Sequence, residues 1–565
     1  MQLSEQEVVR RDKLSKLREL GINPYPADLY PVTDNSKQLK ANFEVGKKVV
    51  IAGRLMSRRI QGKASFAEIQ DSEGRIQVYF NRDEICLGED KTLYNEIYKK
   101  LLDIGDFVGI EGELFMTQVG EKSVRVQNFT LLSKSLKPLP LPKTDAEGNS
   151  FDQFNDPEMR YRQRYADLVV NPHVKEVFIK RTKLFNAMRS FFNNSGYFEV
   201  ETPVLQPIPG GAAARPFITH HNSLDIPLYM RIANELYLKR LIVGGFEGVY
   251  EFSKNFRNEG MDRTHNPEFT AMEIYVAYKD YNWMMTFCEQ LLEHCAIAVN
   301  GTSKATFGKH EIDFKAPYAR VTMADSIKHF TGFDITGKTE DEIRAAAKGM
   351  GISVDATMGK GKLIDEIFGE KCEGNYIQPT FITDYPKEMS PLCKEHRENS
   401  ELTERFELMV CGKEIANAYS ELNDPIDQRE RFEHQLKLAQ KGDDEATQFI
   451  DFDFLRALEY GMPPTSGMGI GMDRLIMFLT NNQSIQEVLF FPQMRPEKKA
   501  ITVELNEDEK AVLTIIEKAE KIDLNDLKTQ SGLSNKKWDK TIKHLTNNKV
   551  AKVVKSEEGL FVQMV

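Results

Sequence analysis

The sequence predicts a multidomain protein with a small N-terminal β-barrel, a large α+β domain and a short C-terminal segment of helices and strands. A chain of 565 residues is too long for one hydrophobic core, because single cores rarely exceed roughly 250 to 300 residues. Short β-type runs dominate from Lys47 to about Leu132, whereas helical and strand patterns alternate from there to about Glu497. A lysine-rich segment follows, from residue 500 to the end.

The bulk composition is that of an ordinary soluble globular protein, and a net charge of −10 still leaves room for a local basic surface. The N-terminal residues lack the apolar core of a signal peptide, and no apolar run approaches the roughly 20 residues of a membrane span. The six cysteines show neither a Cys-x-x-Cys pair nor the spacing of a zinc site, which predicts reduced, mostly buried thiols. We therefore expect a cytoplasmic protein without a membrane segment.

Residues 1–45 are expected to form a charged helix (Leu3 to Leu20) and a proline-marked lead-in. Residues 46–136 contain five short strand patterns, with a predicted helix, Thr92 to Leu102, after the third. This order predicts an OB-fold β-barrel, the small Greek-key barrel of the oligonucleotide-binding type. The predicted strands are Val49 to Leu55, Ala64 to Gln70, Arg75 to Phe80, Asp106 to Glu113 and Val124 to Leu132. A proline-rich and polar linker, 137–160, leads to the α+β domain, 161–497.

Five residues of the predicted barrel, Arg58, Arg59, Lys63, Phe66 and Gln77, form a candidate nucleic-acid surface. On adjacent strands such side chains can share one face. Phe66 offers a ring for base stacking, worth about 1–3 kcal/mol per base. The basic residues would follow phosphates, and Gln77 can read a base edge in an unpaired loop. The alternative is a core Phe66 and arginines that are merely solvated.

Two arginines far apart in the chain suit the binding of a polyphosphate from two sides. Arg257 lies in Phe256-Arg257-Asn258-Glu259-Gly260, and Arg474 opens a predicted helix after a glycine-rich run. A guanidinium stays charged and donates through a planar fork that matches phosphate oxygens. Each block alone is also compatible with an ion pair or a helix cap.

Two acids, Glu407 and Glu414, flank a predicted turn at Cys411-Gly412. On two antiparallel strands they could meet and bind a hard cation, since Mg²⁺ prefers carboxylates together with substrate phosphates and water. Two solvated carboxylates are the alternative.

In this order, the blocks around Arg257 and Arg474 resemble motifs 2 and 3 of the class II aminoacyl-tRNA synthetases, and Gly196 to Pro203 resembles motif 1. The resemblance implies a class II synthetase core with an antiparallel sheet, and a homodimer built by the motif 1 helix and strand. It implies that Arg257 and Arg474 are the catalytic residues: Arg257 contacts the α-phosphate and the amino-acid carboxylate, and Arg474 lies over ATP. It further assigns four residues to ATP binding, namely Glu259, His265, Asn266 and Phe269.

The spacing from Arg58 and Arg59 through Phe66 to Gln77 resembles the anticodon-binding barrel of the aspartyl, asparaginyl and lysyl synthetases, which form subclass IIb. The string from Glu414 to Asp424 resembles the signature of that subclass for metal and amino-acid contacts. Within the subclass the closest resemblance is to the lysyl enzymes. It rests on the strings His220 to Asn222, Arg231 to Arg240 and Met272 to Tyr275.

This resemblance implies a lysine–tRNA ligase that uses ATP and Mg²⁺ to form lysyl-adenylate and then charges tRNA(Lys). The carboxylates suit a lysine substrate, because a buried ammonium requires compensating charge and hydrogen bonds. One departure is Asn234, where a proline commonly precedes the pocket glutamate. The resemblance maps these residues to the lysine pocket: Gly211 in its covering loop, Glu235, Glu273, Tyr275, Asn417, Tyr419 and Glu421.

The same residues disfavour three rival interpretations. An aspartyl or asparaginyl enzyme would require basic residues in the pocket, and a lysine-activating paralogue that modifies a protein would lack the barrel. A non-enzymatic RNA-binding or regulatory protein should have lost Arg257, Arg474 or the Glu407/Glu414 pair, and all four are present. The sequence contains neither a His-x-Gly-His nor a Lys-Met-Ser-Lys-Ser string, which excludes class I synthetases.

Residues 500–565 lie beyond motif 3, where a bacterial lysyl enzyme of this type normally ends. Three helical patterns and two strand patterns predict a winged-helix-like extension. The segment from Ser531 to Lys555 contains seven lysines and only one acidic residue, Asp539, so a basic helix and wing could bind nucleic acid. A small packing domain with a solvated lysine face is the alternative.

Overall fold

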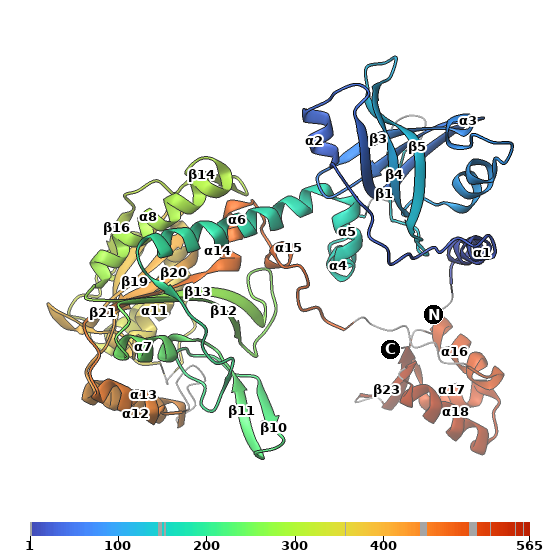
Figure 1. Ribbon diagram of the computed structural model, residues 1–565. Coiled ribbons are helices and arrows are strands. Elements are labelled where there is room, and N and C mark those ends of the chain that lie inside the picture. Colours follow the sequence, from blue (N-terminus) through green and yellow to red (C-terminus); the bar gives the residue numbers. More distant parts are fainter. Residues whose placement is uncertain are drawn as a thin grey trace. The chain divides into compact units, whose positions relative to one another are not determined.

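The computed structural model describes residues 3–144, 150–151, 154–355, 358–440, 449–496, 505–519, 521–548, 550–556 and 559–564. The chain divides into two compact units, Met1–Gln493 and Met494–Val565. The first unit holds a closed barrel and a nine-stranded sheet with its helices, and the second is a small unit of three helices and three short strands (Figure 1).

The N-terminal barrel is closed by five strands in the order β1-β2-β3-β5-β4, and only the β3–β5 pairing is parallel. Buried and half-buried residues alternate strictly along β2 and β3, as expected for strands with one face in a core. The predicted OB-fold is confirmed, including the helical segment after the third strand. The strands are β1 (Lys48–Gln61), β2 (Ala64–Gln70), β3 (Arg75–Asn81), β4 (Phe107–Met116) and β5 (Lys122–Ser133).

Four helical segments accompany the barrel: α1 (Glu5–Glu19), α2 (Ser36–Ala41), α3 (Arg82–Ile85) and a π-helical segment (Leu93–Leu101). A capping box between Ser4 and Glu7 begins α1. This helix is fixed to the barrel by Arg10, whose guanidinium donates to the Ile104 carbonyl at 2.9 Å. The segment predicted as an α-helix at Thr92 to Leu102 is helical, but it has π-type hydrogen bonding.

The predicted linker is partly structured. It contains the short strands β6 (Lys143–Thr144) and β7 (Ser150–Phe151) and the helix α4 (Pro157–Arg162), while residues 145–149 and 152–153 lie outside the described residues. Arg160 on α4 donates to both carboxylate oxygens of Glu487 at 3.0 Å, so this end of the segment is attached to the α+β domain. Helix α5 (Arg164–Val170) follows.

The α+β domain is built on one nine-stranded sheet, in the order β16-β17-β19-β20-β21-β13-β12-β8, with β18 paired to β19. Only the two outer pairings, β16–β17 and β12–β8, are parallel. The predicted antiparallel core is therefore confirmed. The strands are β8 (Phe198–Glu199), β12 (Gly248–Phe256), β13 (Glu268–Ala277), β16 (Ala319–Thr322), β17 (Thr380–Pro386), β18 (Glu395–His396), β19 (Asn399–Val410), β20 (Lys413–Ser420) and β21 (Thr465–Gly471).

One face of this sheet packs on three helices, α6 (Pro172–Asn194), α8 (Tyr281–Asn300) and α14 (Met472–Leu479) (Figure 1). Because side chains alternate along a strand, Met272 and Ile274 of β13 enter this core and Glu273 and Tyr275 face the other side. The same alternation on β20 sends Ala416 and Ala418 into the core and leaves Asn417 on the open face.

The strand predicted in Gly196 to Pro203 is much shorter than expected. Only Phe198–Glu199 pairs, in parallel with β12, and the chain leaves the sheet before Pro203, which lacks a backbone N–H. The motif 1 helix expected before this strand is present as α6.

The remaining elements of the domain surround the open face and the ends of the sheet. A second core joins α7, α12 and α13, and a third joins the inserted helices α9, α10 and α11. Their bounds are α7 (Glu235–Val243), α9 (Met323–Thr331), α10 (Glu340–Gly349), α11 (Lys360–Lys371), α12 (Pro425–Gln440), α13 (Phe452–Glu459) and α15 (Ile485–Val488). Short strands are β9 (Leu205–Gln206), β10 (Ile218–His221), β11 (Ile226–Met230), β14 (Lys304–Phe307) and β15 (His310–Asp313), with 3₁₀ turns at Glu373–Asn375 and Lys387–Met389.

The C-terminal unit has the predicted order of three helices and two long strands, with one additional short strand. Its sheet has the order β22-β24-β23 and closes over a core that contains Trp538 and Leu545. The elements are α16 (Glu507–Ala519), β22 (Lys521–Asp523), α17 (Leu524–Ser531), α18 (Asn535–Asn547), β23 (Ala551–Ser556) and β24 (Gly559–Met564). Of the predicted basic set, Lys549 lies outside the described residues.

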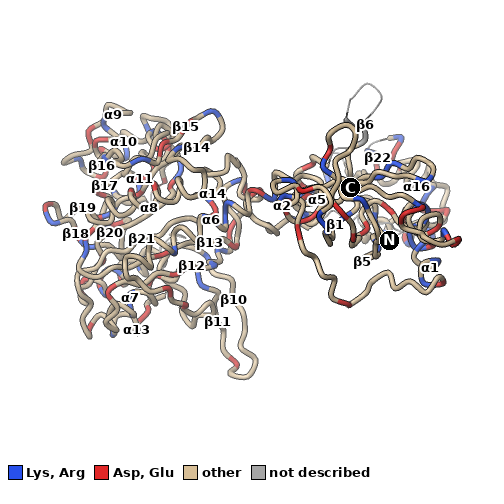
Figure 2. The backbone as a smooth tube through the Cα atoms, turned by 45° about the horizontal axis from the view of Figure 1, so that its top comes forward, with Lys and Arg blue, Asp and Glu red and all other residues tan. Residues whose placement is uncertain are grey.

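Charge and cysteine placement agree with the expectations from composition. Acidic and basic residues are interspersed along the chain, so any basic surface is local (Figure 2). All six cysteines are free, and five are buried while Cys411 is half-buried. No helix among the described residues has the length and apolarity to cross a membrane.

Candidate active site

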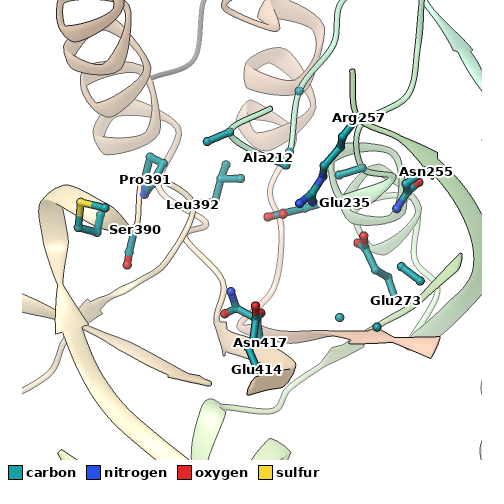
Figure 3. Close-up of a pocket in the computed structure, with 18 of the residues that line it drawn as sticks. Ala212, Glu235, Asn255, Arg257, Glu273, Ser390, Pro391, Leu392, Glu414 and Asn417 are labelled. Atoms are coloured by element: carbon teal, nitrogen blue, oxygen red, sulfur yellow. The ribbon is translucent and has the colours of Figure 1, made fainter. Parts of the chain in front are cut away.

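A cavity of about 960 Å³ lies on the open face of the large sheet. Its lining joins segments that are far apart in the sequence, from the loop at Gly211 to the start of α14. Figure 3 shows Arg257, Glu235 and Glu273 directed toward one part of the cavity. Most of the residues predicted from the sequence line it: Gly211, Glu235, Arg257, Glu259, His265, Asn266, Phe269, Glu273, Tyr275, Glu414, Asn417, Tyr419 and Arg474. Glu407 and Glu421 do not.

Arg257 follows β12 directly and is held at the start of the loop to β13. Its backbone N–H donates to the Pro267 carbonyl at 2.8 Å, and its guanidinium lies over the Phe269 ring, 5.0 Å from the centroid. Among the described residues its buried Nε has no hydrogen-bond partner. A positioned donor of this kind is ready to bind an anion.

Three other predicted residues, Glu259, His265 and Asn266, lie in the same loop between β12 and β13. Glu259 and His265 are exposed on the cavity wall, and His265 Nδ1 lies 2.8 Å from Asp262 Oδ2. Asn266 is buried and donates to the Glu268 carbonyl at 2.6 Å. Asn266 therefore fixes the shape of the loop.

Across the same cavity, Arg474 sits in the first turn of α14, directly after β21. It donates to the Glu414 carbonyl at 2.5 Å and lies 3.8 Å from a Glu414 carboxylate oxygen. The fold thus brings the two predicted arginines to one cavity, although more than two hundred residues separate them.

The predicted amino-acid pocket contains three buried carboxylates and two tyrosines. The Tyr419 hydroxyl donates to Glu235 at 2.5 Å, and the Tyr275 hydroxyl donates to Glu273 at 3.1 Å. Burial, followed by the charge of Glu235, raises the pKa of Glu273 to about 8. A cation bound beside Glu273 would favour the ionised form of this carboxyl.

Glu421 lies behind the cavity wall at Gly467. A Cβ added at Gly467 would lie 2.2 Å from Glu421 Oε1 and 2.4 Å from the Tyr275 ring, so the carboxylate occupies space that only glycine leaves open. Burial raises the pKa of Glu421, and an ion pair with the buried ammonium of Lys239 opposes this shift.

Gly211 and Asn234 shape the edge of this pocket. Gly211 has a φ of +87°, and a Cβ there would lie 3.2 Å from the Cβ atoms of Ala233 and Glu235, so glycine suits both the backbone and the space. Asn234, the departure from the family pattern, is buried and donates to Glu251 at 2.8 Å. Its side chain thereby joins the neighbouring Arg231–Glu251 ion pair of 2.7 Å.

Glu407 and Glu414 lie on neighbouring strands, as expected, but they are not a direct cross-strand pair. Glu407 is opposite Asn417 and Glu414 is opposite Met409, with an irregular register between. Burial and then the nearby charge of Glu414 raise the pKa of Glu407, while Arg405 donates to Glu407 at 2.6 Å. The two carboxylates are thus close enough to repel each other, which a shared divalent cation would relieve.

No group of three or more His, Cys, Asp or Glu side chains suited to a metal occurs in the described part of the chain. Protein ligation at Glu407 and Glu414 would therefore be limited to carboxylates that share the ion with phosphates and water. Mg²⁺ prefers such an arrangement, so the residues present fit this cation.

The barrel residues predicted to bind nucleic acid are only partly on one face. Arg59 is opposite Phe66, and Gln77 is opposite Glu68, which places Arg59, Phe66 and Gln77 on the outer surface. Gln77 already donates to Ser123 at 2.8 Å. The prediction that all five residues share the face is wrong for Arg58, which is opposite the core residue Ala67 and donates to the Tyr98 carbonyl.

Phe66 has aromatic neighbours that are not among the residues predicted from the sequence. Its ring lies 5.0 Å from that of Tyr79, which is 5.8 Å from Phe115. The Arg125 guanidinium lies 5.0 Å over Phe115. The alternation in β3 placed Tyr79 on the same side as Gln77, so this signal was present in the sequence, whereas the β4 and β5 contributions depend on barrel closure.

Comparisons with known proteins agree with this architecture. The family described as "tRNA synthetases class II (D, K and N)" matches residues 156–495, and "OB-fold nucleic acid binding domain" matches residues 49–132. A lysine–tRNA ligase of Christiangramia forsetii is 78% identical over 559 residues, which cover 99% of this chain and 98% of that protein. A lysine–tRNA ligase of Porphyromonas gingivalis is 70% identical over 505 residues, with 88% and 87% covered. A lysine–tRNA ligase of Azobacteroides pseudotrichonymphae is 65% identical over 499 residues, with 88% and 99% covered.

Proposed function

The chain belongs to the class II aminoacyl-tRNA synthetases and, among them, to the lysine–tRNA ligases, and we propose that the cavity described above is where lysine is activated. The enzyme activates L-lysine with ATP to lysyl-adenylate and pyrophosphate, and then transfers lysine to the 3′ end of tRNA(Lys) with release of AMP. The observation that carries the site assignment is the meeting of Arg257 with the acids Glu235 and Glu273 in one cavity. These groups complement the carboxylate and the ammonium groups of lysine.

In the first step a carboxylate oxygen of lysine attacks the α-phosphorus of ATP, and the bond from that phosphorus to pyrophosphate breaks. Arg257, with its free Nε, binds the α-phosphate and the lysine carboxylate, and Arg474 neutralises charge from the opposite wall. Such a reaction depends on positioning and on stabilising the developing charge. We assign the adenine and γ-phosphate contacts to Glu259, His265 and Phe269, and the loop geometry to Asn266. In the second step the terminal hydroxyl of tRNA attacks the lysyl carbonyl and AMP leaves.

Selectivity for lysine rests on the acids of the pocket. Glu235, Glu273 and Glu421 supply negative charge, and Tyr275 and Tyr419 orient two of these acids through hydrogen bonds. An uncharged isostere would leave buried carboxylates without a counter-charge, which is costly. Asn417 and Gly211 complete the wall of the pocket.

Mg²⁺ is the cofactor that the carboxylate pair favours. Glu407 and Glu414 would hold it, with the ATP phosphates and water as the remaining ligands. When bound, the ion neutralises charge on the phosphates and orients them.

The outer face of the barrel is the proposed anticodon site. Arg59, Phe66 and Gln77, together with Tyr79 and Phe115, offer cations, stacking surfaces and one base-reading amide. Arg58 would have an indirect role, because its guanidinium packs over the ring of Tyr98 and not on the outer face. The proposed divisions are the lead-in 1–45, the barrel 46–136, the linker 137–160, the catalytic domain 161–497 and the winged-helix-like extension 500–565.

A homodimer and a cytoplasmic location complete the proposal. Exposed apolar residues gather near the motif 1 segment, with Phe198 58% and Phe246 40% exposed and their rings 5.6 Å apart. A partner subunit would cover them. Six unpaired cysteines suit a reducing compartment.

The test of the site assignment is Arg257→Lys, assayed by lysine-dependent ATP–pyrophosphate exchange. Lysine keeps the charge but loses the planar fork, so kcat should fall by on the order of 10²- to 10³-fold. Arg344→Lys, on α10 and outside the cavity lining, is the control. An Arg257→Lys enzyme with near-normal kcat would remove Arg257 from the reaction.

A further inference from the structure

Lys239 is a fully buried lysine at the back of the amino-acid pocket. Its side chain is 0% exposed, its ammonium lies 2.6 Å from Glu235 Oε1, and it also pairs with Glu421. The rings of Tyr419 and Tyr275 surround it at 5.5 and 6.0 Å. The contacts join it to four residues assigned above to lysine binding.

The position of Lys239 follows from the helix that carries it. Glu235 opens α7 and Lys239 is one turn later, so the two side chains lie on the same helix face. Glu421 follows β20 and reaches the same ammonium from the sheet. Burial disfavours the charge of Lys239, but the two carboxylates outweigh it and raise its pKa.

The charges of the pocket balance a lysine substrate only when Lys239 is counted. When all three carboxylates (Glu235, Glu273 and Glu421) are ionised, as pairing with lysine requires, they face two cations, Lys239 and Arg257, which leaves one negative charge. Free lysine carries two ammonium groups and one carboxylate, and therefore one net positive charge. Without Lys239 the pocket would hold one negative charge too many for its substrate, and buried uncompensated charge is strongly unfavourable.

We propose that Lys239 is a specificity-determining positioning residue, whose ammonium neutralises one of the three pocket carboxylates and anchors Glu235 and Glu421 for the substrate. It sets the charge of the pocket to the complement of lysine. The inference rests on the function proposed above and extends it to a residue that does not line the cavity.

A matched lysine elsewhere in the chain separates this role from a general effect on folding. Lys134 in the barrel is also 0% exposed and also lies between two carboxylates, Asp103 at 2.6 Å and Asp106 at 2.8 Å. Lys239→Met and Lys134→Met therefore remove the same kind of buried ion pair. Only the first change lies in the amino-acid pocket.

The assay is ATP–pyrophosphate exchange without tRNA, with separate titrations of lysine, ATP and the uncharged isostere norleucine. Lys239→Met should raise the lysine KM at least tenfold and leave the ATP KM within threefold. Its preference for lysine over norleucine, measured as the ratio of kcat/KM values, should fall at least tenfold. Lys134→Met should change neither the lysine KM nor this preference, whatever its effect on Tm.

Removing Lys239 should partly reverse the effect of removing the Glu421 charge. Glu421→Gln alone leaves Lys239 in excess and should raise the lysine KM. Adding Lys239→Met to Glu421→Gln restores one net negative charge, so the double variant should have a lower lysine KM than Glu421→Gln, by about tenfold. The double variant also buries no unpaired lysine, so it serves if Lys239→Met alone does not fold.

Two results would overturn the role of Lys239: a lysine KM and norleucine preference in Lys239→Met like those of the parent, or a double variant no better than Glu421→Gln. Both presuppose lysine-dependent exchange by the parent enzyme. If the parent itself fails to exchange with lysine, the proposed function falls instead, so the two failures are distinguishable.

Discussion

The pH dependence of lysine binding follows from the burial of Glu273. Its carboxyl has a pKa of about 8, raised first by burial and then by Glu235. The acid must be ionised to pair with the substrate ammonium, and below its pKa a proton competes with lysine. About half of the empty sites are ionised at pH 8 but only roughly 1% at pH 6, since each pH unit below the pKa lowers the ionised fraction about tenfold. The lysine KM should therefore rise roughly 50-fold as the pH falls from about 8 to about 6.

Pyrophosphate exchange at saturating ATP measures this effect, with the ATP KM determined at every pH to detect changes in the nucleotide site. Glu273→Gln is the matched control, because glutamine keeps the shape and cannot titrate. Its lysine KM should be high and nearly independent of pH between 6 and 8. A parent enzyme whose lysine KM varies less than threefold over this range, with a steady ATP KM, would refute the protonated state of Glu273.

The raised pKa of Glu273 should also make the folding stability of the enzyme fall as the pH rises. The pKa of Glu273 is raised above its ordinary value of 4.5, so the folded state holds a proton that the unfolded chain releases. This contribution is present below about pH 4.5 and is lost as the pH rises through about 8. Glu273→Gln should therefore raise the Tm of the empty enzyme more at pH 9 than at pH 6.

Two further predictions concern the barrel and the pocket wall. Phe66→Ala should raise the tRNA KM in aminoacylation roughly 5- to 150-fold, because about 1–3 kcal/mol of stacking is lost, and it should leave ATP–pyrophosphate exchange unchanged. The control is Phe107→Ala, which removes a 38% exposed phenylalanine whose ring contacts Arg54. Equal effects of the two variants would reject the anticodon face. Gly467→Ala should displace Glu421 and Tyr275, because the new Cβ would lie 2.2 and 2.4 Å from their side chains. Such overpacking costs about 1–3 kcal/mol, which would raise the lysine KM roughly 5- to 150-fold. Gly349→Ala, with no atom within 4 Å of the added Cβ, is the control, and an unchanged lysine KM in Gly467→Ala would show that the pocket adapts.

The barrel and the large sheet could be predicted because their strands are bounded by clear turns and alternate in polarity. The strand Ala64 to Gln70 was predicted with its observed bounds, and the helix after β3 was expected. The strand at motif 1 was overestimated, because alternation alone does not reveal that only Phe198–Glu199 finds a partner.

The arginines and acids of the active site were found through residue types and their order along the chain. Lys239 was not, because a lysine one turn after a glutamate on a helix also describes an ordinary surface pair. Its burial depends on Glu421, which lies nearly two hundred residues later and approaches from the sheet. Such a long-range pairing has no local signal in the sequence.

The surface of the barrel shows the same limit. Arg58 and Arg59 are adjacent, so they must point to opposite sides of β1, but the choice of side depends on the irregular register between Leu55 and Ser57. Helix α11 contributes Lys362 and Glu366 to the cavity wall, and no sequence motif predicted these two residues. Their position at the cavity depends on how α11 packs in the folded domain.

ATP–pyrophosphate exchange with each of the twenty amino acids, without tRNA, shows whether this cavity activates lysine with ATP. We expect exchange with lysine far above every other amino acid, because a pocket that contains Glu235, Glu273, Glu421, Lys239 and Arg257 complements both the net charge of lysine and its compact side-chain ammonium. Exchange with aspartate or asparagine in place of lysine, or no exchange by folded protein supplied with Mg²⁺, would contradict this expectation.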